Sequence, residues 1–176
     1  MRRLLTMIAF MVAIGGPAHA QTRSITPEES KLRGFIVTLA LGEVEGGKTA
    51  GTFTAAATKA LADLKDFLPY KSYRLLDTVW TLGLNGPHQF LRGADGEKHE
   101  FFMRSTLVSA TDVKVDTLRL WDVPPKESEW MPPGMTPAPL LIDTDFKLTV
   151  GETVVVGTSR IDSARGLILL VTAAPK

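Results

Sequence analysis

The two segments EFFMRSTLV (residues 100–108) and DVKVDTLRLWD (residues 112–122) decide the fold class of this chain. Both are rich in aromatic, aliphatic and β-branched residues, and only three residues separate them, which predicts two strands joined by a short turn. In the second segment the apolar positions change phase between Val115 and Leu118, the change that a β-bulge produces. The chain is therefore expected to consist mainly of antiparallel strands.

Turn residues extend this pattern in both directions along the chain. Asp95-Gly96 lies between Phe90-Leu91 and Phe101-Phe102, which predicts a hairpin. Gly151-Glu152 is a two-residue turn with glycine first, which predicts a type II′ hairpin between the strands on either side of it. The further strands that we expect cover residues 35–41, 72–84, 140–150, 153–158 and 166–172, and the last of these is apolar enough to be central in a sheet.

One helix is predicted, over residues 53–68. Its apolar residues recur at helical spacing, Thr52 precedes it as the N-cap, and Pro69 ends it. A helix with one apolar face usually packs against a sheet. We therefore expect an α+β fold: a single domain with a mostly antiparallel β-sheet of about six to eight strands and one main amphipathic helix.

The first 20 residues have the plan of a secretory signal peptide. Arg2 and Arg3 open it, an apolar run extends to Ile14, and Ala18-His19-Ala20 is a small-x-small cleavage site. The apolar run is shorter than the ~20 residues that span a bilayer. The domain organisation that we expect is a signal peptide at 1–20, a flexible lead-in at 21–33, and a single domain at 34–174 with a proline-rich loop at 124–139.

Composition excludes several classes of function. The chain has no cysteine, so disulfides, thiolate metal sites and a cysteine nucleophile are ruled out. Removal of Arg2 and Arg3 with the signal peptide leaves 18 Lys and Arg against 19 Asp and Glu, which gives no basic surplus for nucleic acid. No later apolar stretch approaches 18 residues, so no transmembrane segment is expected after cleavage.

The segment GEVEGGKT (residues 42–49) matches the phosphate-binding pattern G-x-x-x-x-G-K-[ST]. In such a loop backbone amides hold the phosphates, the lysine neutralises charge and the threonine hydroxyl holds magnesium, roles that would fall to Gly42, Gly47, Lys48 and Thr49. Two glutamates within the loop and the three residues between Thr49 and the expected helix favour a solvated connection instead. Nucleotide binding stays open as an alternative.

No constellation of catalytic or metal-binding residues stands out. We expect His99, beside the hairpin tip, to be a surface histidine, because a metal site needs three or four converging ligands. Asp143 and Asp145 point to one face of a strand, but no loop of further oxygen ligands for calcium follows them. The serines lack a G-x-S-x-G pattern. The sequence thus predicts no catalytic residue, no metal and no cofactor, and a protein that is not an enzyme.

The proline-rich loop carries the candidate interaction residues Trp130, Met131 and Met135. Apolar side chains in a long loop either pack back on their domain or form an exposed contact, and the sequence leaves both options open. Trp80 and Trp121 are expected to serve packing, because nothing in their spacing stacks them as a sugar platform.

The C-terminal third resembles the closing segment of the bacterial secretin family, the outer-membrane rings of secretion and pilus systems. The resemblance is carried by FKLTVGETVVVG (residues 146–157) and LILLVT (residues 167–172), since secretins also end with a strand, a Gly-Glu-Thr turn, a Val-rich strand and an apolar strand. LPYKSYRLLD (residues 68–77) also resembles a segment of small exported bacterial proteins of uncharacterised function. Thr158 stands where secretins usually have a second glycine, and the chain is far too short for a secretin pore. The resemblance implies a detached secretin-like module.

Three hypotheses of function follow. The first is an exported, non-catalytic envelope protein that acts by protein–protein contact, as a secretin-like accessory or scaffold whose partners are envelope proteins such as secretion or pilus components. The second is a nucleotide-binding enzyme that uses the GEVEGGKT segment. The third is a periplasmic protein that binds a small ligand. In each case the expected localisation is exported, either periplasmic or associated with the envelope.

Overall fold

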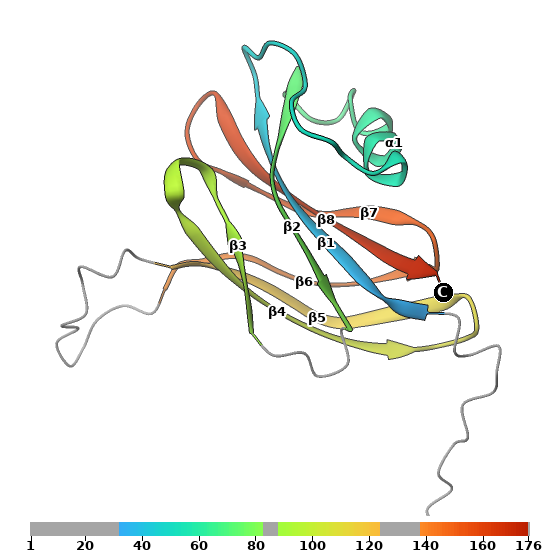
Figure 1. Cartoon of the computed structure of the whole chain (residues 1–176). Coiled ribbons are helices and arrows are strands. Elements are labelled where there is room, and N and C mark those ends of the chain that lie inside the picture. Colours follow the sequence, from blue (N-terminus) through green and yellow to red (C-terminus); the bar gives the residue numbers. More distant parts are fainter. Residues whose placement is uncertain (1–31, 83–87, 124–137, 176) are drawn as a thin grey trace, which may run out of the picture.

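The computed structural model describes residues 32–82, 88–123 and 138–175, which form three layers (Figure 1). Two four-stranded antiparallel sheets pack face to face, and one helix lies on the outer face of the first sheet. The strand order is β2-β1-β8-β7 in the first sheet, called sheet A, and β3-β4-β5-β6 in the second, called sheet B. Eight strands and one main helix confirm the expected α+β class. The strands are divided between two sheets, whereas a single sheet was expected.

Each sheet contains four strands, and the two sheets draw on different parts of the chain. Sheet A consists of β1 (Leu32–Glu43), β2 (Ser72–Thr81), β7 (Thr153–Arg160) and β8 (Arg165–Pro175). Sheet B consists of β3 (Gln89–Arg92), β4 (Lys98–Leu107), β5 (Asp112–Val123) and β6 (Leu140–Thr149). Helix α1 (Ala55–Asp63) lies between β1 and β2, and a single 3₁₀ turn, η2 (Ala94–Gly96), joins β3 to β4.

The main core lies between the two sheets. Side chains alternate along each strand, so every second residue of β1 and β8 points at sheet B. The buried inward-facing residues include Phe35, Val37, Leu39 and Leu41 of β1, Leu167, Leu169 and Val171 of β8, and Phe101, Met103, Val115, Leu118 and Leu120 of sheet B. Burying each such side chain stabilises the fold by about 1.5–3 kcal/mol.

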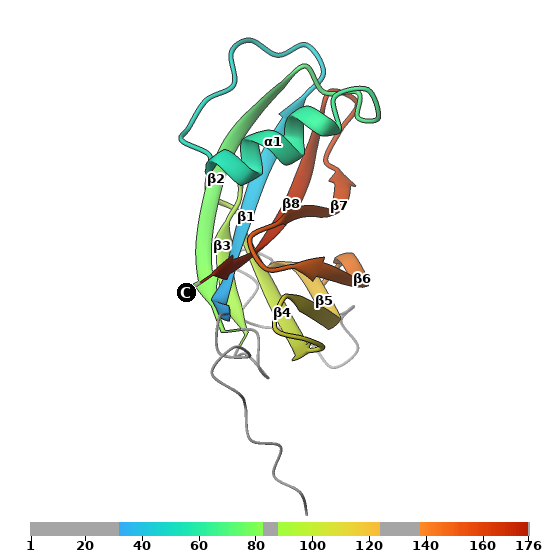
Figure 2. The ribbon, with the colours of Figure 1, turned by 90° about the vertical axis from the view of Figure 1, so that its right-hand side faces the viewer.

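A second, smaller core explains why β8 is apolar along both faces. Ile168 and Leu170 point away from sheet B and pack against Ala57 and Leu61 of α1. Figure 2 shows α1 lying across the outer face of sheet A. Because β8 is flanked by β1 and β7 and covered on both sides, its residues from Leu167 to Ala173 are buried, which confirms the prediction of a central strand.

Two local predictions in sheet B are confirmed. The register of β5 against β6 shifts between Val115 and Leu118, at the position where the apolar phase changes. The Asp95-Gly96 segment is the tip of the β3–β4 hairpin, with φ of 56° at Asp95 and 85° at Gly96.

Helix α1 is shorter than the predicted 53–68, and its N-cap is Thr54 and not Thr52. The Thr54 hydroxyl accepts a 3.1 Å hydrogen bond from the Ala57 amide, which satisfies one of the free donors of the first turn. At the other end the Lys65 amide bonds to Ala62, three residues back, so the helix tightens and stops. The Leu64–Leu68 spacing persists as a separate turn, closed by a 3.0 Å bond from the Leu68 amide to the Leu64 carbonyl.

The predicted hairpin at Gly151-Glu152 is wrong, because β6 pairs with β5 while β7 pairs with β8. The turn is closed by the Glu152 amide on the Thr149 carbonyl at 3.0 Å, so its central residues are Val150 and Gly151. Gly151, with φ of 92°, therefore occupies the third position, as in a type II turn. Such a turn splays the strands that it joins, whereas a type II′ turn would pair them. The chain crosses here from sheet B to sheet A.

Several expected segments lie outside the described residues: the signal peptide at 1–20, the lead-in up to residue 31, and positions 124–137 of the proline-rich loop. Among the described helical residues, no helix has the length and apolar character needed to cross a membrane.

Candidate functional site

A pocket of about 400 Å³ lies between α1, the segments that flank this helix, and β2. Its apolar lining residues are Phe53, Leu61, Ala62, Leu68, Pro69 and Tyr70, and its polar ones are Thr49, Thr58, Lys65, Lys71 and Tyr73. A concave, mostly apolar pocket with a few polar groups is the usual form of a small-molecule site. We call this feature the α1 pocket.

Tyr73 of β2 brings a buried polar group to the α1 pocket. Its side chain is 9% exposed, and its hydroxyl has no hydrogen-bond partner among the described residues. Burial, and to a smaller extent the neighbouring Tyr70, raise the pKa of the Tyr73 hydroxyl, so this group is a protonated donor at neutral pH. An unpaired buried hydroxyl costs about 1–3 kcal/mol, which a bound molecule with an acceptor would offset.

Tyr70 is held against sheet A by two glycines. Gly42 of β1 and Gly166 of β8 are paired directly across the sheet, and a Cβ atom at either position would overlap the Tyr70 side chain. The side chain therefore lies against the bare backbone of both strands, as aromatic residues do when they cover glycines in a sheet. This packing sets the position of one wall of the α1 pocket.

The segment that matches the phosphate-loop pattern has a different geometry from a phosphate-binding loop. Gly42 is part of β1, and α1 begins at Ala55, six residues after Thr49, so the helix N-terminus does not follow the Lys-Thr pair directly. Thr49 accepts a weak 3.4 Å hydrogen bond from the Tyr73 amide and lines the α1 pocket. Gly47 and Lys48 do not line this pocket. The geometry of this segment therefore does not favour nucleotide binding.

His99 is buried, and its prediction as a surface residue is wrong. It lies on β4 between Leu91 of β3 and Asp122 of β5, faces the interior and is 2% exposed. Its Nδ1 lies 3.6 Å from Asp122 and its Nε2 lies 3.9 Å from Glu97, and neither nitrogen has a hydrogen bond within the described residues. Burial lowers the pKa of His99, although both carboxylates act in the opposite sense.

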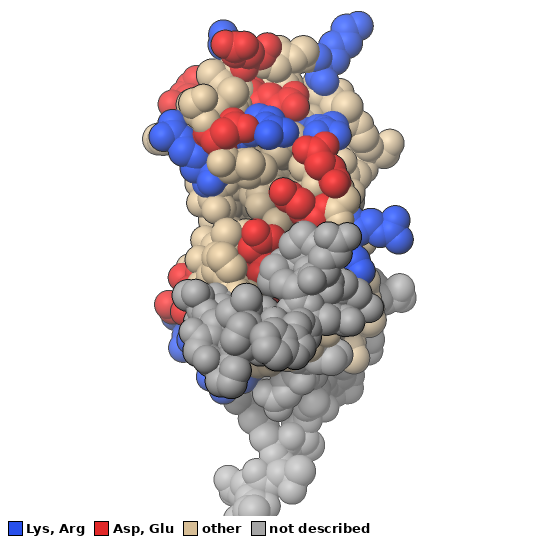
Figure 3. Space-filling view, turned by 90° about the vertical axis from the view of Figure 1, so that its left-hand side faces the viewer, with Lys and Arg blue, Asp and Glu red and all other residues tan. Residues whose placement is uncertain are grey.

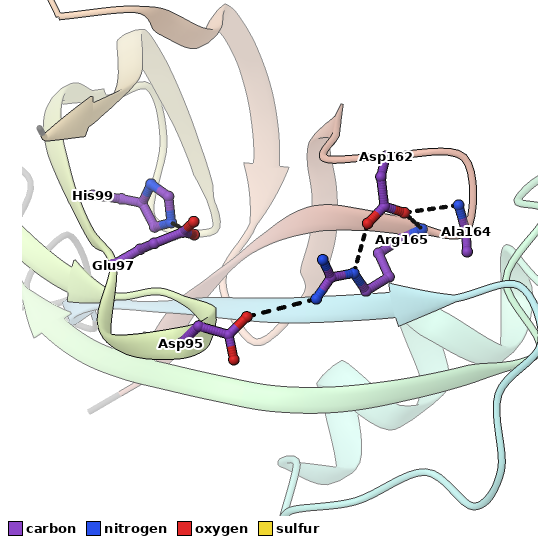
Figure 4. A network of polar contacts seen from close by, with 6 residues as sticks. All are labelled: Asp95, Glu97, His99, Asp162, Ala164 and Arg165. Atoms are coloured by element: carbon purple, nitrogen blue, oxygen red, sulfur yellow. Dashed lines mark hydrogen bonds and ion pairs between the residues drawn. The ribbon is translucent and has the colours of Figure 1, made fainter.

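The tip of the β3–β4 hairpin is tied to the β7–β8 turn by a small ionic network (Figure 4). Arg165 lies 2.8 Å from Asp162 and 3.6 Å from Asp95. Asp162 also accepts hydrogen bonds from the amides of Ala164 and Arg165, and the Arg165 contact and these amides lower the pKa of its carboxyl. Figure 3 shows acidic and basic side chains interspersed over the upper part of one face of the molecule. We interpret the network as a brace between the two sheets.

A row of large side chains crosses the outer face of sheet B. Phe90, Glu100, Trp121 and Leu140 are successive cross-strand partners on the four strands. His88 lies above this row, with Nδ1 2.6 Å from the Glu100 carboxylate and its ring stacked on Trp121 at 5.9 Å. Phe90 is 57% exposed and Leu140 is 49% exposed. This row, called the aromatic row, is a second candidate surface.

The other residues singled out from the sequence are not brought together. Asp143 and Asp145 lie on one face of a strand, β6, as predicted; both are exposed, and Asp143 pairs with Arg119 at 3.1 Å. Across the described part of the chain, no group of three or more His, Asp or Glu side chains could hold a metal ion. Trp80 is 54% exposed and packs over Gly34 of β1. Trp130, Met131 and Met135 lie outside the described residues.

Comparison with known proteins found no matching family model, no similar curated protein and no similar solved structure. The secretin resemblance therefore stays a prediction.

Of the residues that line the α1 pocket, only Thr49 was a candidate site residue from the sequence. The lining residues all lie within residues 49–73, but they belong to the segment before α1, to α1 itself, to the connection after it and to the start of β2. Lys65, Lys71 and the two tyrosines look like ordinary loop and strand residues until the helix is folded onto the sheet. The one available signal was the pair of tyrosines three residues apart, just after the predicted end of the helix.

Proposed function

We propose that this protein is an exported, non-catalytic binding protein that holds a small amphipathic molecule in the α1 pocket. The observation that carries this proposal is the largely apolar pocket of about 400 Å³ beside α1, whose lining includes Tyr73 with its buried, unpartnered hydroxyl. Volumes of this order accommodate small organic molecules. An apolar body would fill the space beside α1, and an acceptor group on the molecule would satisfy the hydroxyl.

Filling the pocket with a side chain tests this function. Ala62 is exposed on α1 and lines the pocket, whereas Ala55 is exposed on the same helix and does not line it. We expect the neutral fluorescent probe N-phenyl-1-naphthylamine to bind the wild-type protein. Ala62→Trp should abolish that binding and Ala55→Trp should leave it unchanged. Native mass spectrometry of protein purified from an exporting host should also reveal a co-purified small molecule, absent from Ala62→Trp.

The proposal fails if neither this probe nor its anionic counterpart 8-anilinonaphthalene-1-sulfonate binds, or if both tryptophan variants bind them as the wild type does. Circular dichroism of both variants verifies that the helix is retained. Because α1 covers an apolar face of sheet A, a loss of helix would be visible as a fall in thermal stability.

A second candidate function, protein–protein contact at the envelope, is favoured by the aromatic row. Phe90 and Leu140 of this row are large apolar side chains that are about half exposed. In the sequence, the proline-rich loop that carries Trp130, Met131 and Met135 lies between Val123 and Leu140. Changing those three residues together to serine, in parallel with Phe90→Ser, tests this role by affinity capture from the envelope fraction. If both variants retain every partner of the wild type, this second function is wrong.

A further inference from the structure

The charged residues of the α1 pocket all have the same sign. Among the residues that line it, only Lys65 and Lys71 are charged, and no aspartate or glutamate is present. Within the part of the chain that the structure describes, neither lysine takes part in an ion pair. Both come from the connection between α1 and β2, on either side of the lining residues Leu68, Pro69 and Tyr70.

We infer that the molecule held in the α1 pocket is an organic anion, with an apolar body and one carboxylate, sulfonate or phosphate group; this inference rests on the proposed function. The apolar wall takes the body, and Lys65 and Lys71 neutralise the anionic group. Both ammonium groups are exposed to solvent, so a neutral molecule would gain little from them and a cationic one would be repelled.

The charges around the pocket favour this assignment when they are weighed together. The carbonyl end of α1 contributes about half a negative charge, which is smaller than the two full positive charges of the lysines. Asp63 and Asp66 are neighbours of Lys65 in the sequence and, like Lys65 and Lys71, are exposed, but neither aspartate lines the pocket. Solvent screens all four charges, so the two lysines that line the pocket act on a bound molecule at the shortest range.

Tyr73 adds a further reason. Its hydroxyl is protonated at neutral pH, so it can donate a hydrogen bond but does not repel an anion. Hydrogen bonds to a charged acceptor are shorter and stronger than bonds between neutral groups. An anionic oxygen that reaches this hydroxyl would satisfy a group that has no partner among the described residues.

Two probes that share one aromatic body test the inference. 8-Anilinonaphthalene-1-sulfonate is an anion, and N-phenyl-1-naphthylamine is its neutral counterpart. We expect the wild-type protein to bind the anion more tightly. The double variant Lys65→Gln/Lys71→Gln should bind the anion roughly tenfold more weakly and the neutral probe unchanged. Decanoate should displace the anionic probe at concentrations where decanol does not.

The matched control is Lys48→Gln/Lys59→Gln, which removes the same charge from two described lysines that do not line the pocket. This control should retain the preference for the anion, and added salt should weaken binding of the anionic probe alone. Equal binding of the two probes by the wild type, or an equal loss in both double variants, would overturn the inference and leave the proposed function standing. The proposed function itself fails when neither probe binds, or when Ala62→Trp has no effect on either.

Discussion

The side chain of Tyr70 packs so closely on Gly42 that a Cβ atom added to Gly42 would lie 2.5 Å from the Tyr70 ring. Gly42 is the first glycine of the segment that matches a phosphate-binding pattern, yet its place in the fold is within strand β1 under an aromatic side chain. The lack of a side chain at this position therefore serves packing of the α1 pocket wall. Gly47, the second glycine of the pattern, has no atom within 4 Å of the position that a Cβ would take.

This difference gives the first prediction. Gly42→Ala should lower the free energy of unfolding by about 1–3 kcal/mol, the usual cost of overpacking. Gly47→Ala should change it by less than about 0.5 kcal/mol, as expected for an open surface site. Urea denaturation of the two variants measures both values. Equal losses would mean that the Tyr70 packing does not limit position 42.

Replacing Tyr73 by phenylalanine should separate stability from binding. Tyr73→Phe removes a buried hydroxyl that has no partner among the described residues, so the free energy of unfolding should rise by roughly 1 kcal/mol. The same change should weaken binding of 8-anilinonaphthalene-1-sulfonate, because the hydroxyl that would donate a hydrogen bond to the sulfonate is lost. Denaturation and probe titration of one protein sample give both quantities. A variant that is less stable than the wild type would show that the hydroxyl is already satisfied.

His99 should make the protein less stable in mild acid. Its pKa is lowered by burial, so the unfolded chain binds a proton more readily than the folded protein. The stability contributed by neutral His99 is present above the unfolded pKa of about 6.5 and is lost as the pH falls through that value toward the folded pKa. The denaturation midpoint should therefore decrease as the pH is lowered from 7 to 5.

The control for this pH dependence is the other described histidine. In His99→Gln the slope between pH 7 and pH 5 should flatten, whatever the absolute stability of the variant. In His88→Gln, where the altered residue is on the exterior and more than half exposed, the slope should persist. A slope that disappears only in His88→Gln would show that the pH dependence comes from His88 and would contradict this prediction.

Gly151 should show which turn joins the two sheets. A positive φ in the left-handed region costs an alanine about 1 kcal/mol relative to glycine, while asparagine tolerates that region better. We therefore expect Gly151→Ala to lower the free energy of unfolding by about 1 kcal/mol and Gly151→Asn by less. No atom lies within 4 Å of a Cβ at this position, so the loss reports backbone conformation alone. An asparagine variant that is less stable than the alanine variant would contradict a type II arrangement.

Local patterns account for most of what could be predicted about this fold. The alternation in β4 and β5, the phase change between Val115 and Leu118, and the apolar run that becomes β8 are all properties of neighbouring residues, which share one strand. The helix bounds were less accurate, because Thr52 and Thr54 are both good N-caps and only the hydrogen bond to Ala57 distinguishes them.

The sequence by itself determined the strands, the helix and their apolar faces, because periods of two and about 3.6 residues are set by backbone geometry. Only the tertiary structure decided that the strands form two sheets, that His99 is buried, and that Tyr70, Tyr73, Lys65 and Lys71 surround one pocket. These features depend on which strand pairs with which and on where α1 folds back. At the turn Val150-Gly151 the chain passes from sheet B to sheet A, where β7 pairs with β8. No local sequence pattern specifies that pairing.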